Sequence, residues 1–284
     1  MGKDALRPFV EKRLGMTFKE RYGPWALITG ASSGIGAEFS SQLAELGLNL
    51  ILLARRKQRL DDLAQQLEAR NNIQVRTLRA DLSQPDFMSD IRSATQSIEV
   101  GLLVNNAGFG LAGNFLAHPL ERELALLDVN CRAPLLLTHE FGRKMIERGR
   151  GGIIFVSSVS GYIATPSEAS YAASKAYELF LAESLWYELK KDGVDVLALC
   201  PGVTVSEFHD LAGIKPVAAM PANPVVALAL KKLGKKPSVI AGWHNRLLVS
   251  LIKFVPRCIT TAQAGRVMEN LLLKTATSEG QRET

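Results

Sequence analysis

Short apolar runs alternate with longer amphipathic segments from Trp25 onward. The apolar runs favour β-strands because they are short, bounded by turn residues and rich in Val, Ile and Leu. The segments between them carry apolar residues three or four positions apart, as amphipathic helices do. We expect strands at residues 25–29, 48–54, 73–80, 101–106, 152–158 and 194–200, with 237–242 as a candidate seventh. We expect helices at residues 35–46, 59–70, 85–98, 120–147 and 171–191.

This alternation predicts an α/β fold, namely a three-layer, doubly wound parallel sheet of six to seven strands with helices on both faces. Ligands of such sheets bind beyond the carboxyl ends of the strands, so candidate chemistry is sought there. No internal repeat and no flexible linker divides the 284 residues. One domain with terminal additions therefore accounts for the chain.

A glycine-rich turn follows the first predicted strand. Residues 29–36 read Thr-Gly-Ala-Ser-Ser-Gly-Ile-Gly and lead into the first predicted helix. Glycines let the backbone approach a pyrophosphate, whose charge is favourable at a helix N-terminus. An ordinary strand-to-helix turn is the alternative, but the place of this turn in a repeating pattern favours a dinucleotide site. Its expected cofactor-binding residues are Gly30, Ser32, Ser33, Gly34, Ile35 and Gly36.

The end of the second predicted strand indicates which dinucleotide is bound. An acidic residue there would bind the ribose hydroxyls of NAD, but this chain has Ala54 followed by Arg55 and Arg56. A guanidinium group suits the 2′-phosphate of NADP(H). We therefore expect NADP(H), with Arg55 as the phosphate clamp and Ser32 and Arg56 as helpers. A solvated basic turn is the alternative.

Further motifs follow the later strands. They are Asp81-Leu82, Asn105-Asn106-Ala107-Gly108, Ser158, Tyr171-Ala172-Ala173-Ser174-Lys175 and Pro201-Gly202. With the glycine spacing, they resemble the short-chain dehydrogenase/reductase family over roughly residues 24–210. Within this family the chain looks closest to a bacterial branch related to 3-ketoacyl reductases and 17-beta-hydroxysteroid dehydrogenases. The resemblance implies a Rossmann fold and an NADP-dependent oxidoreductase.

The same resemblance implies four catalytic residues. Tyr171 and Lys175 are four positions apart on a predicted helix and share one face. An ammonium group nearby favours the phenolate and so lowers the pKa of a tyrosine, which is ordinarily about 10. Ser158 would polarise the carbonyl, whereas its neighbour Ser157 points to the opposite face of the strand. Asn130 completes the set.

Asn130 lies inside a predicted helix, where asparagine is a poor residue. The resemblance implies that it bends this helix locally and holds a water that leads to Lys175. A neutral polar residue facing the next helix is the alternative. Asp81 has an alternative of its own, since it could cap the following helix instead of contacting the adenine.

The resemblance also implies the remaining cofactor contacts. Asp81 and Leu82 lie at the adenine, and Tyr171 and Lys175 contact the cofactor as well as the substrate. The residues that line the cofactor wall or hold the nicotinamide end are Asn106, Ala107, Gly108, Pro201, Gly202, Thr204 and Ser206. We expect a lid over the substrate at about 203–236.

The residues expected around the substrate are apolar, which predicts a hydrophobic ketone or aldehyde of acyl, steroid-like or aromatic type. They are Phe109, Phe115, Tyr162, Ile163, Phe208, Leu211 and Met220. The expected reaction is reduction of this carbonyl with NADPH, with Tyr171 as general acid. The alternatives are an NADPH-binding sensor or scaffold without turnover, and a lipid carbonyl reductase on a membrane surface.

These assignments divide the chain into an N-terminal extension at 1–23, a catalytic domain at 24–242 and an amphipathic C-terminal extension at 243–284. The basic C-terminal segment could contact a membrane surface weakly, cover the substrate mouth or pack on the sheet. The long helices after the fourth and fifth strands suit a homo-oligomer, either a dimer or a tetramer.

Charge and cysteine content exclude other classes. The net charge is +6, but the basic residues are mixed with acidic ones, so we expect no nucleic-acid partner. The three cysteines and four histidines show no metal-ligand spacing, so we expect no metal. An odd number of distant cysteines fits a reducing compartment, and no apolar run is long enough to span a membrane. We expect a cytoplasmic protein.

Overall fold

A computed structural model describes residues 16–207 and 219–280 of the chain. Seven parallel strands form one sheet in the order β3-β2-β1-β4-β5-β6-β7. All seven predicted strands are confirmed, including the candidate seventh. Their bounds are β1 Trp25–Thr29, β2 Asn49–Ala54, β3 Val75–Arg79, β4 Val100–Asn105, β5 Gly151–Val156, β6 Val194–Cys200 and β7 Ser238–Ile240.

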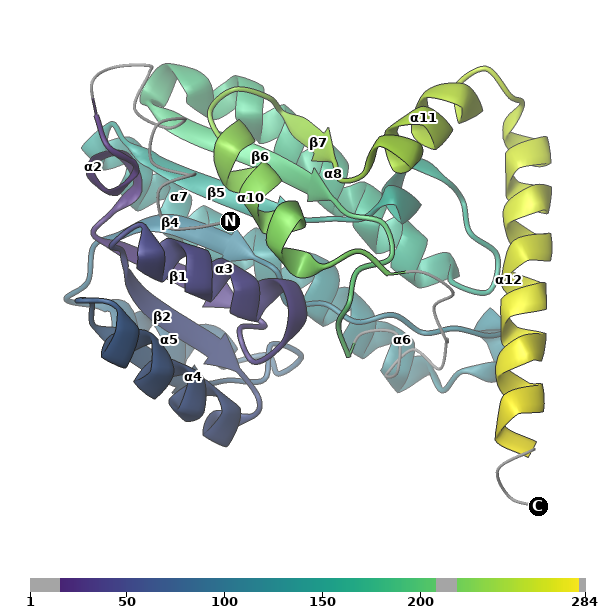
Figure 1. Ribbon diagram of the computed structural model, residues 1–284, viewed down its shortest axis with the longest axis horizontal. Coiled ribbons are helices and arrows are strands. Elements are labelled where there is room, and N and C mark those ends of the chain that lie inside the picture. The colour runs from purple at the N-terminus through teal and green to yellow at the C-terminus, as the bar shows by residue number, and fades with distance from the viewer. Residues whose placement is uncertain (1–15, 208–218, 281–284) are drawn as a thin grey trace.

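Helices cover both faces of the sheet (Figure 1). One face packs against α2 (Phe18–Tyr22), α3 (Gly34–Glu45), α4 (Lys57–Arg70) and α10 (Ala222–Lys232). The other face packs against α5 (Phe87–Thr95), α7 (Ala133–Arg148) and α8 (Ala169–Leu189). Because the five central strands are apolar on both sides, both layers are needed to remove the sheet from water. The predicted doubly wound α/β sheet is therefore confirmed.

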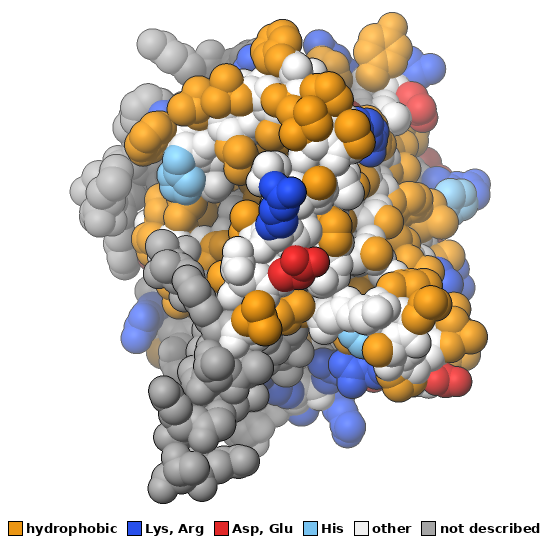
Figure 2. Space-filling model, turned by 90° about the vertical axis from the view of Figure 1, so that its right-hand side faces the viewer, with side chains coloured by type: hydrophobic (Ala, Val, Ile, Leu, Met, Phe, Trp, Pro, Cys, Tyr) orange, Lys and Arg blue, Asp and Glu red, His pale blue; other side chains and the backbone are white. Residues whose placement is uncertain are grey.

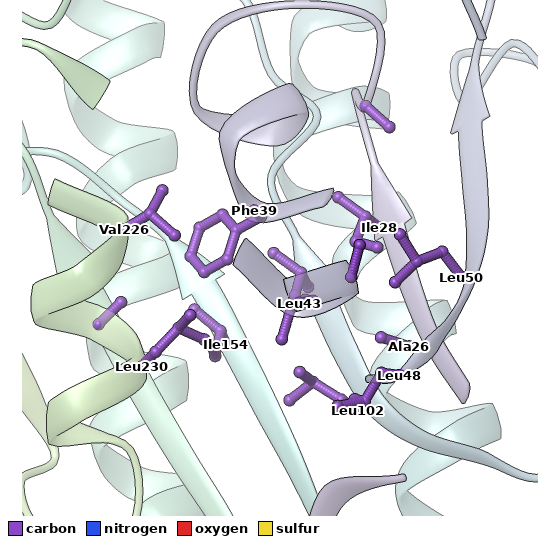
Figure 3. Packing of buried hydrophobic residues seen from close by; sticks show 14 of the residues in the cluster. Ala26, Ile28, Phe39, Leu43, Leu48, Leu50, Leu102, Ile154, Val226 and Leu230 are labelled. Carbon is purple, nitrogen blue, oxygen red and sulfur yellow. The ribbon is translucent and has the colours of Figure 1, made fainter. Parts of the chain in front are cut away.

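The hydrophobic core between the sheet and the layer of α2, α3, α4 and α10 is built by side chains from segments far apart in the sequence. Figure 3 shows Phe39 and Leu43 of α3 beside Val226 and Leu230 of α10, above Ile154 of β5. Phe39, Leu43 and Ile154 are completely buried. This packing fixes the start of α3, and with it the glycine turn, against the carboxyl ends of β1 and β4.

The helix predicted over residues 120–147 is interrupted. Helix α6 (Leu120–Leu127) continues into a π-helical turn (Asp128–Arg132), and α7 begins at Ala133. Asn130, where a local bend was expected, lies at the centre of this π turn, so the regular helix is distorted there. Such turns inside helices often occur at functional sites.

Helix α2 lies inside the predicted N-terminal extension, yet it is part of the folded domain. Phe18 and Tyr22 are buried against the sheet. The Tyr22 hydroxyl donates to Asp195 of β6 at 2.7 Å. Gly152 of β5 makes room for the ring, since a Cβ there would lie 2.9 Å from Tyr22 Cδ1. The first residues of the described chain thus close the amino-terminal edge of the sheet.

The segment expected to form a lid, about 203–236, contains helix α10, whose residues Val225 and Val226 are fully buried in the core. Residues 208–218 lie outside the described part of the chain. The lid thus remains a prediction for the residues before α10.

The C-terminal extension forms two helices, α11 (Trp243–Ile252) and α12 (Arg257–Gly280). Helix α11 packs against β7, and α12 runs along one side of the molecule (Figure 1). Among the described residues, no helix has the length and apolar character needed to cross a bilayer.

Candidate active site

The glycine turn between β1 and α3 adopts a conformation that favours glycine. Gly30 and Gly34 have φ angles of 65° and 54°. A Cβ on Gly36 would lie 2.3 Å from the carbonyl oxygen of Gly30, so Gly36 is required for the helix to start so close to the turn. The Asn106 side chain donates to the carbonyl of Thr29 at 2.8 Å and joins the ends of β1 and β4. The turn from Gly30 to Gly36 therefore forms a cradle that is held against the ends of β1 and β4.

Basic side chains at the end of β2 lie beside this cradle. Arg56 donates to the hydroxyls of Ser32 at 2.9 Å and Ser33 at 3.1 Å. Arg56 and Arg59 also bind the carboxylate of Glu207. Hydrogen bonds from Arg59 and Arg56 lower the pKa of Glu207 to about 2. A guanidinium pair that holds a carboxylate has the chemistry needed to hold a phosphate.

Arg55, the predicted clamp, lines the same cavity and lies near Asp81. Burial opposes ionisation of Asp81, but hydrogen bonds from Ser83 and the charge of Arg55 hold its pKa below the usual value. Asp81 accepts from the Ser83 amide at 3.0 Å, as a cap of the following turn does. The following helix, α5, begins at Phe87 with Asp86 as its N-cap, so Asp81 holds the turn after β3 and does not cap that helix.

The segment after β6 crosses the glycine turn. A Cβ on Gly34 would lie 2.7 Å from Cβ of Ser206, so the two backbones approach closely. Thr204 is paired with Met220 in a short parallel bridge and is buried. The predicted residues Thr204 and Ser206 thus lie beside the cradle, on the side nearer β6.

Tyr171 of α8 and Ser158 at the end of β5 are brought together. Burial raises the pKa of Tyr171. A hydrogen bond with Ser158 acts in the opposite direction, while the carboxylates of Glu168 and Glu178 add to the increase, so the net shift is upward. Ser157, by contrast, donates to the carbonyl of Lys175 at 2.7 Å and fastens the strand to the helix. The structure thus turns Ser158, and not Ser157, toward the phenol.

Lys175 lies below the phenol, and its ammonium is paired. Its Nζ atom lies 5.8 Å from the centroid of the Tyr171 ring. It donates to the carbonyl of Val156 at 2.9 Å and to Glu178 at 2.8 Å. Glu178 is buried, and burial raises its pKa although Lys175 acts in the opposite direction. Sequence reasoning missed Glu178, which is three residues after Lys175 on the same helix.

Asn130 connects the π turn to two other segments of the site, the loop at Phe109 and helix α8 at Ser174. Its Nδ2 atom donates to the carbonyl of Phe109 at 3.0 Å and to Ser174 Oγ at 3.0 Å, while its Oδ1 atom accepts from the Phe109 amide. A Cβ on Gly108 would lie 3.2 Å from Asn130 Oδ1 and 3.3 Å from Lys175 Nζ. The Asn130 amide and the Lys175 ammonium therefore both lie close to the backbone of Gly108.

These residues surround one cavity of about 770 Å³. Ser158, Tyr171 and Lys175 line it together with every predicted cofactor residue except Gly36. Asn130 is fully buried and does not line it. The glycine cradle, the arginines beside it and a cavity of this volume suit a dinucleotide with a small molecule beside it.

The apolar wall of the cavity differs from the predicted one. Of the seven expected residues, Phe109 lines the cavity, whereas Phe208 and Leu211 lie outside the described residues. Tyr162 and Met220 pack into the two cores instead. Neither Phe115 nor Ile163 lines the cavity. The lining residues that sequence reasoning missed include Arg122, Ala125, Val129, Glu168, Met268 and Leu271.

Met268 and Leu271 belong to α12, so the C-terminal extension covers part of the cavity. Met268 is buried, with Ala112 and Leu271 packed against it. An apolar spacing of three positions in the tail was the available signal, but its partner could not be identified from sequence. In the described part of the chain, no group of His, Cys, Asp and Glu could hold a metal ion.

Comparison with known proteins places this geometry in a family. Residues 24–213 match the family model of short chain dehydrogenases. A 7beta-hydroxysteroid dehydrogenase of Mediterraneibacter gnavus is 32% identical over 242 residues, covering 82% of this chain and 92% of that protein. A very-long-chain 3-oxoacyl-CoA reductase of Pyricularia oryzae is 34% identical over 230 residues, covering 78% and 69%. The predicted kinship with ketoacyl reductases and hydroxysteroid dehydrogenases is confirmed.

A solved structure supports the same assignment. A short-chain dehydrogenase from Sphingobium yanoikuyae in complex with NADPH superimposes with a TM-score of 0.74 and 31% identity, covering 83% of this chain and 97% of that one. The glycine cradle, the parallel sheet and the sequence match over 24–213 agree. The chain therefore belongs to the short-chain dehydrogenase family of NAD(P)-dependent oxidoreductases.

Proposed function

We propose that this oxidoreductase uses NADPH to reduce a hydrophobic ketone or aldehyde, of acyl, steroid-like or aromatic type, to an alcohol. The observation that carries the proposal is the meeting of Ser158, Tyr171 and Lys175 with the glycine cradle around one cavity. The similar proteins named for a hydroxysteroid and for a 3-oxoacyl-CoA support a large apolar substrate.

The residues present fit the cofactor. The cradle from Gly30 to Gly36 would hold the pyrophosphate, and Arg55, Arg56 and Ser32 would hold the 2′-phosphate. Asp81 and Leu82 lie where the adenine would bind. The nicotinamide end would be bounded by Asn106, Ala107, Gly108, Pro201, Gly202, Thr204, Ser206, Tyr171 and Lys175. When bound, NADPH supplies the hydride for the carbonyl carbon.

Side chains of the protein stabilise the negative charge that develops on the carbonyl oxygen and supply the proton to it. As the carbonyl oxygen becomes negative, the Ser158 hydroxyl stabilises it by a hydrogen bond. The Tyr171 hydroxyl then donates its proton to that oxygen. Its raised pKa keeps the phenol protonated at neutral pH, which is the state that reduction requires. Lys175 and Asn130 hold the phenol and the neighbouring backbone in place.

Apolar side chains complete the site. Phe109 and Val129 line the cavity on one side, and Met268 and Leu271 of α12 line it on another. Exclusion of water from this region strengthens the hydrogen bonds of Ser158 and Tyr171 to the reacting oxygen. An apolar substrate would pack against these side chains.

Replacement of Tyr171 by Phe tests the mechanism. We expect NADPH oxidation with a panel of steroid, 3-oxoacyl and aromatic ketones to fall by about 10² to 10⁴ in kcat, the usual contribution of a general acid. NADPH binding, measured by its fluorescence, should remain. The matched control is Tyr162→Phe, because Tyr162 is a partly buried tyrosine that packs in the core near Cys200, away from the cavity lining.

Two results would contradict the proposal. Unchanged turnover in Tyr171→Phe would remove Tyr171 as the proton donor. Preference for NADH in the same panel would refute the role of the arginines at the end of β2. If the wild-type protein binds NADPH but reduces none of the panel, the sensor or scaffold alternative is favoured instead.

A further inference from the structure

Helix α11 and the beginning of α12 expose large apolar side chains. Val249 is the one buried residue of α11. Trp243 is 71% exposed, and Phe254, in the turn between the two helices, is 88% exposed. The other exposed apolar residues of this surface are Leu247, Leu248, Leu251, Val255, Ile259 and Val267. Folded proteins rarely leave so many neighbouring apolar side chains in water unless the surface has a partner.

The charge of this surface has one sign. Residues 243–268 contain no Asp or Glu but include Arg246, Lys253, Arg257 and Arg266. All four side chains are exposed, and none forms an ion pair with the described residues. Cations beside exposed Trp and Leu are the composition of helices that lie in the interface of an anionic bilayer.

The surface lies next to the mouth of the active site. Met268 and Leu271 on the inner side of α12 line the cavity, whereas Val267, one position before Met268, is exposed on the outer side. Figure 2 views the molecule from the side of α12 and shows many apolar side chains across the described part of this face, with Lys and Arg among them and few acidic groups. One helix therefore separates the cavity from this surface.

A second copy of the chain is a poorer partner for this surface than a lipid headgroup layer. In a symmetric dimer the same patch would face itself, which would bring four cations per subunit together without a carboxylate from residues 243–268. Juxtaposed like charges oppose association. Anionic headgroups neutralise these cations, while the acyl region accepts the apolar side chains.

We propose that residues 243–267 dock this protein on the surface of an anionic lipid bilayer, with Trp243, Leu251 and Phe254 inserted among the acyl chains. Docking itself does not depend on the proposed reaction, but its biological role rests on that reaction. With α12 against the bilayer, an apolar carbonyl substrate dissolved in lipid would reach the cavity directly. Vesicle binding is measured without turnover, so docking and the proposed reaction can fail separately.

Co-sedimentation with vesicles tests the apolar part. The full-length protein should pellet with equimolar phosphatidylglycerol and phosphatidylcholine, and not with phosphatidylcholine alone. Phe254→Ser should lower the partition coefficient about tenfold, whereas the matched control Phe254→Leu, which keeps an apolar side chain, should bind as the wild type does. Phe254 is too exposed for either change to disturb the core.

A charge series tests the basic part. Replacing Arg246, Lys253 and Arg257 together by Gln should weaken binding at low salt by about a hundredfold. The matched control removes the same charge from Arg70, Arg79 and Lys191, which are exposed elsewhere, and should bind almost normally. Quenching of Trp243 by lipids brominated in the acyl chains should accompany binding and be lost in Trp243→Phe.

The proposal is wrong if the wild type stays in the supernatant or binds neutral vesicles equally well. It is also wrong if both variants of each pair bind alike. Size-exclusion chromatography tests whether a second copy of the chain binds this surface instead. Should Phe254→Ser convert a wild-type dimer into monomers while vesicles have no effect, the surface is an interface between two copies of the chain.

Discussion

The buried ion pair of Lys175 and Glu178 bears directly on the chemistry of Tyr171. An unpaired ammonium near the phenol would favour the phenolate strongly. Here Glu178 accepts from Lys175 Nζ at 2.8 Å, and the charge of Glu178 raises the pKa of Tyr171. Both partners are almost completely buried, so water screens this interaction little. We infer that Glu178 acts through Lys175 as a positioning residue that keeps the phenol protonated.

Glu178→Gln is expected to move the pH profile of carbonyl reduction. Gln keeps an acceptor for Lys175 but removes the negative charge, so the pKa of Tyr171 falls. The alkaline limb of kcat/KM, where the proton donor is lost, should move about one unit toward lower pH. Glu178→Asp, which retains the charge, should restore the wild-type limb. A profile that is the same in all three proteins would contradict this role.

Glu168 provides a second test, through stability. It lies at the start of α8 and lines the cavity, and burial raises its pKa from the ordinary value of 4.5 to about 7. A raised folded pKa means that stability is fully present below pH 4.5 and is lost as the pH rises toward 7. Glu168→Gln removes this loss. At pH 8 we expect the variant to be on the order of 2 kcal/mol more stable than the wild type.

Urea unfolding at pH 8 and pH 4.5 checks the Glu168 prediction. The difference between variant and wild type should shrink toward zero at the lower pH, because the wild-type carboxyl is then neutral. A variant less stable than the wild type at pH 8 would show that the Glu168 carboxylate has a favourable partner in the folded protein.

At the scale of elements, α2 shows that the boundary at residue 24 divides a folded unit. Thr17 and Glu20 form a capping box that starts this short helix. The helix is too short to persist alone, so its stability comes from Phe18 and Tyr22 packing on the sheet. The bond from Tyr22 to Asp195 then ties it to β6.

Tyr22→Ala should therefore destabilise the protein. Loss of the buried aromatic ring beside Gly152 leaves a cavity and removes the Tyr22 hydrogen bond to Asp195, which Arg21 still binds. We expect a cost of about 3 to 5 kcal/mol in the free energy of unfolding. Tyr22→Phe keeps the ring and loses the hydrogen bond, which costs about 1 to 2 kcal/mol. Equal unfolding midpoints for Tyr22→Ala and wild type in urea would show that α2 is not part of the core.

The elements that sequence predicted best are those with a strong period or a special turn. The seven strands and the start of α3 agree because apolar runs and the Gly30 to Gly36 turn act locally. The break in the helix over 120–147 was expected only as a bend at Asn130, since the three bonds of Asn130 that accompany the π turn reach Phe109 and Ser174 in other segments.

The site was predictable for the same reason, and in the same measure. Ser158, Tyr171 and Lys175 follow motifs of fixed spacing, and the structure brings them together. Glu178, Glu168 and Met268 belong to no motif, and their approach to the cavity depends on how α8 and α12 pack. The wall residues Tyr162 and Met220 were wrongly placed because an apolar residue near a strand end can equally well enter the core.

At the scale of the whole molecule, Glu207 joins two distant parts of the cofactor site. It follows β6, and its carboxylate is held by Arg56 and Arg59 beside the turn between β1 and α3. Of these two arginines, Arg56 is also proposed to bind the 2′-phosphate of NADPH. The pKa of Glu207, about 2, keeps the carboxylate ionised throughout the neutral range. The carboxylate and the phosphate therefore compete for the guanidinium group of Arg56.

Glu207→Gln should consequently strengthen NADPH binding. Exposed ion pairs contribute little, so we expect Kd to fall only about two- to fivefold in fluorescence titrations at low salt. The gain should be confined to ligands with a 2′-phosphate: adenosine 2′,5′-bisphosphate should gain as NADPH does, whereas adenosine 5′-monophosphate and NADH should not. High salt should abolish the difference. An equal gain for NADH would show that Glu207 affects the cradle as a whole, and weaker NADPH binding would show that it supports the arginines instead of competing for them.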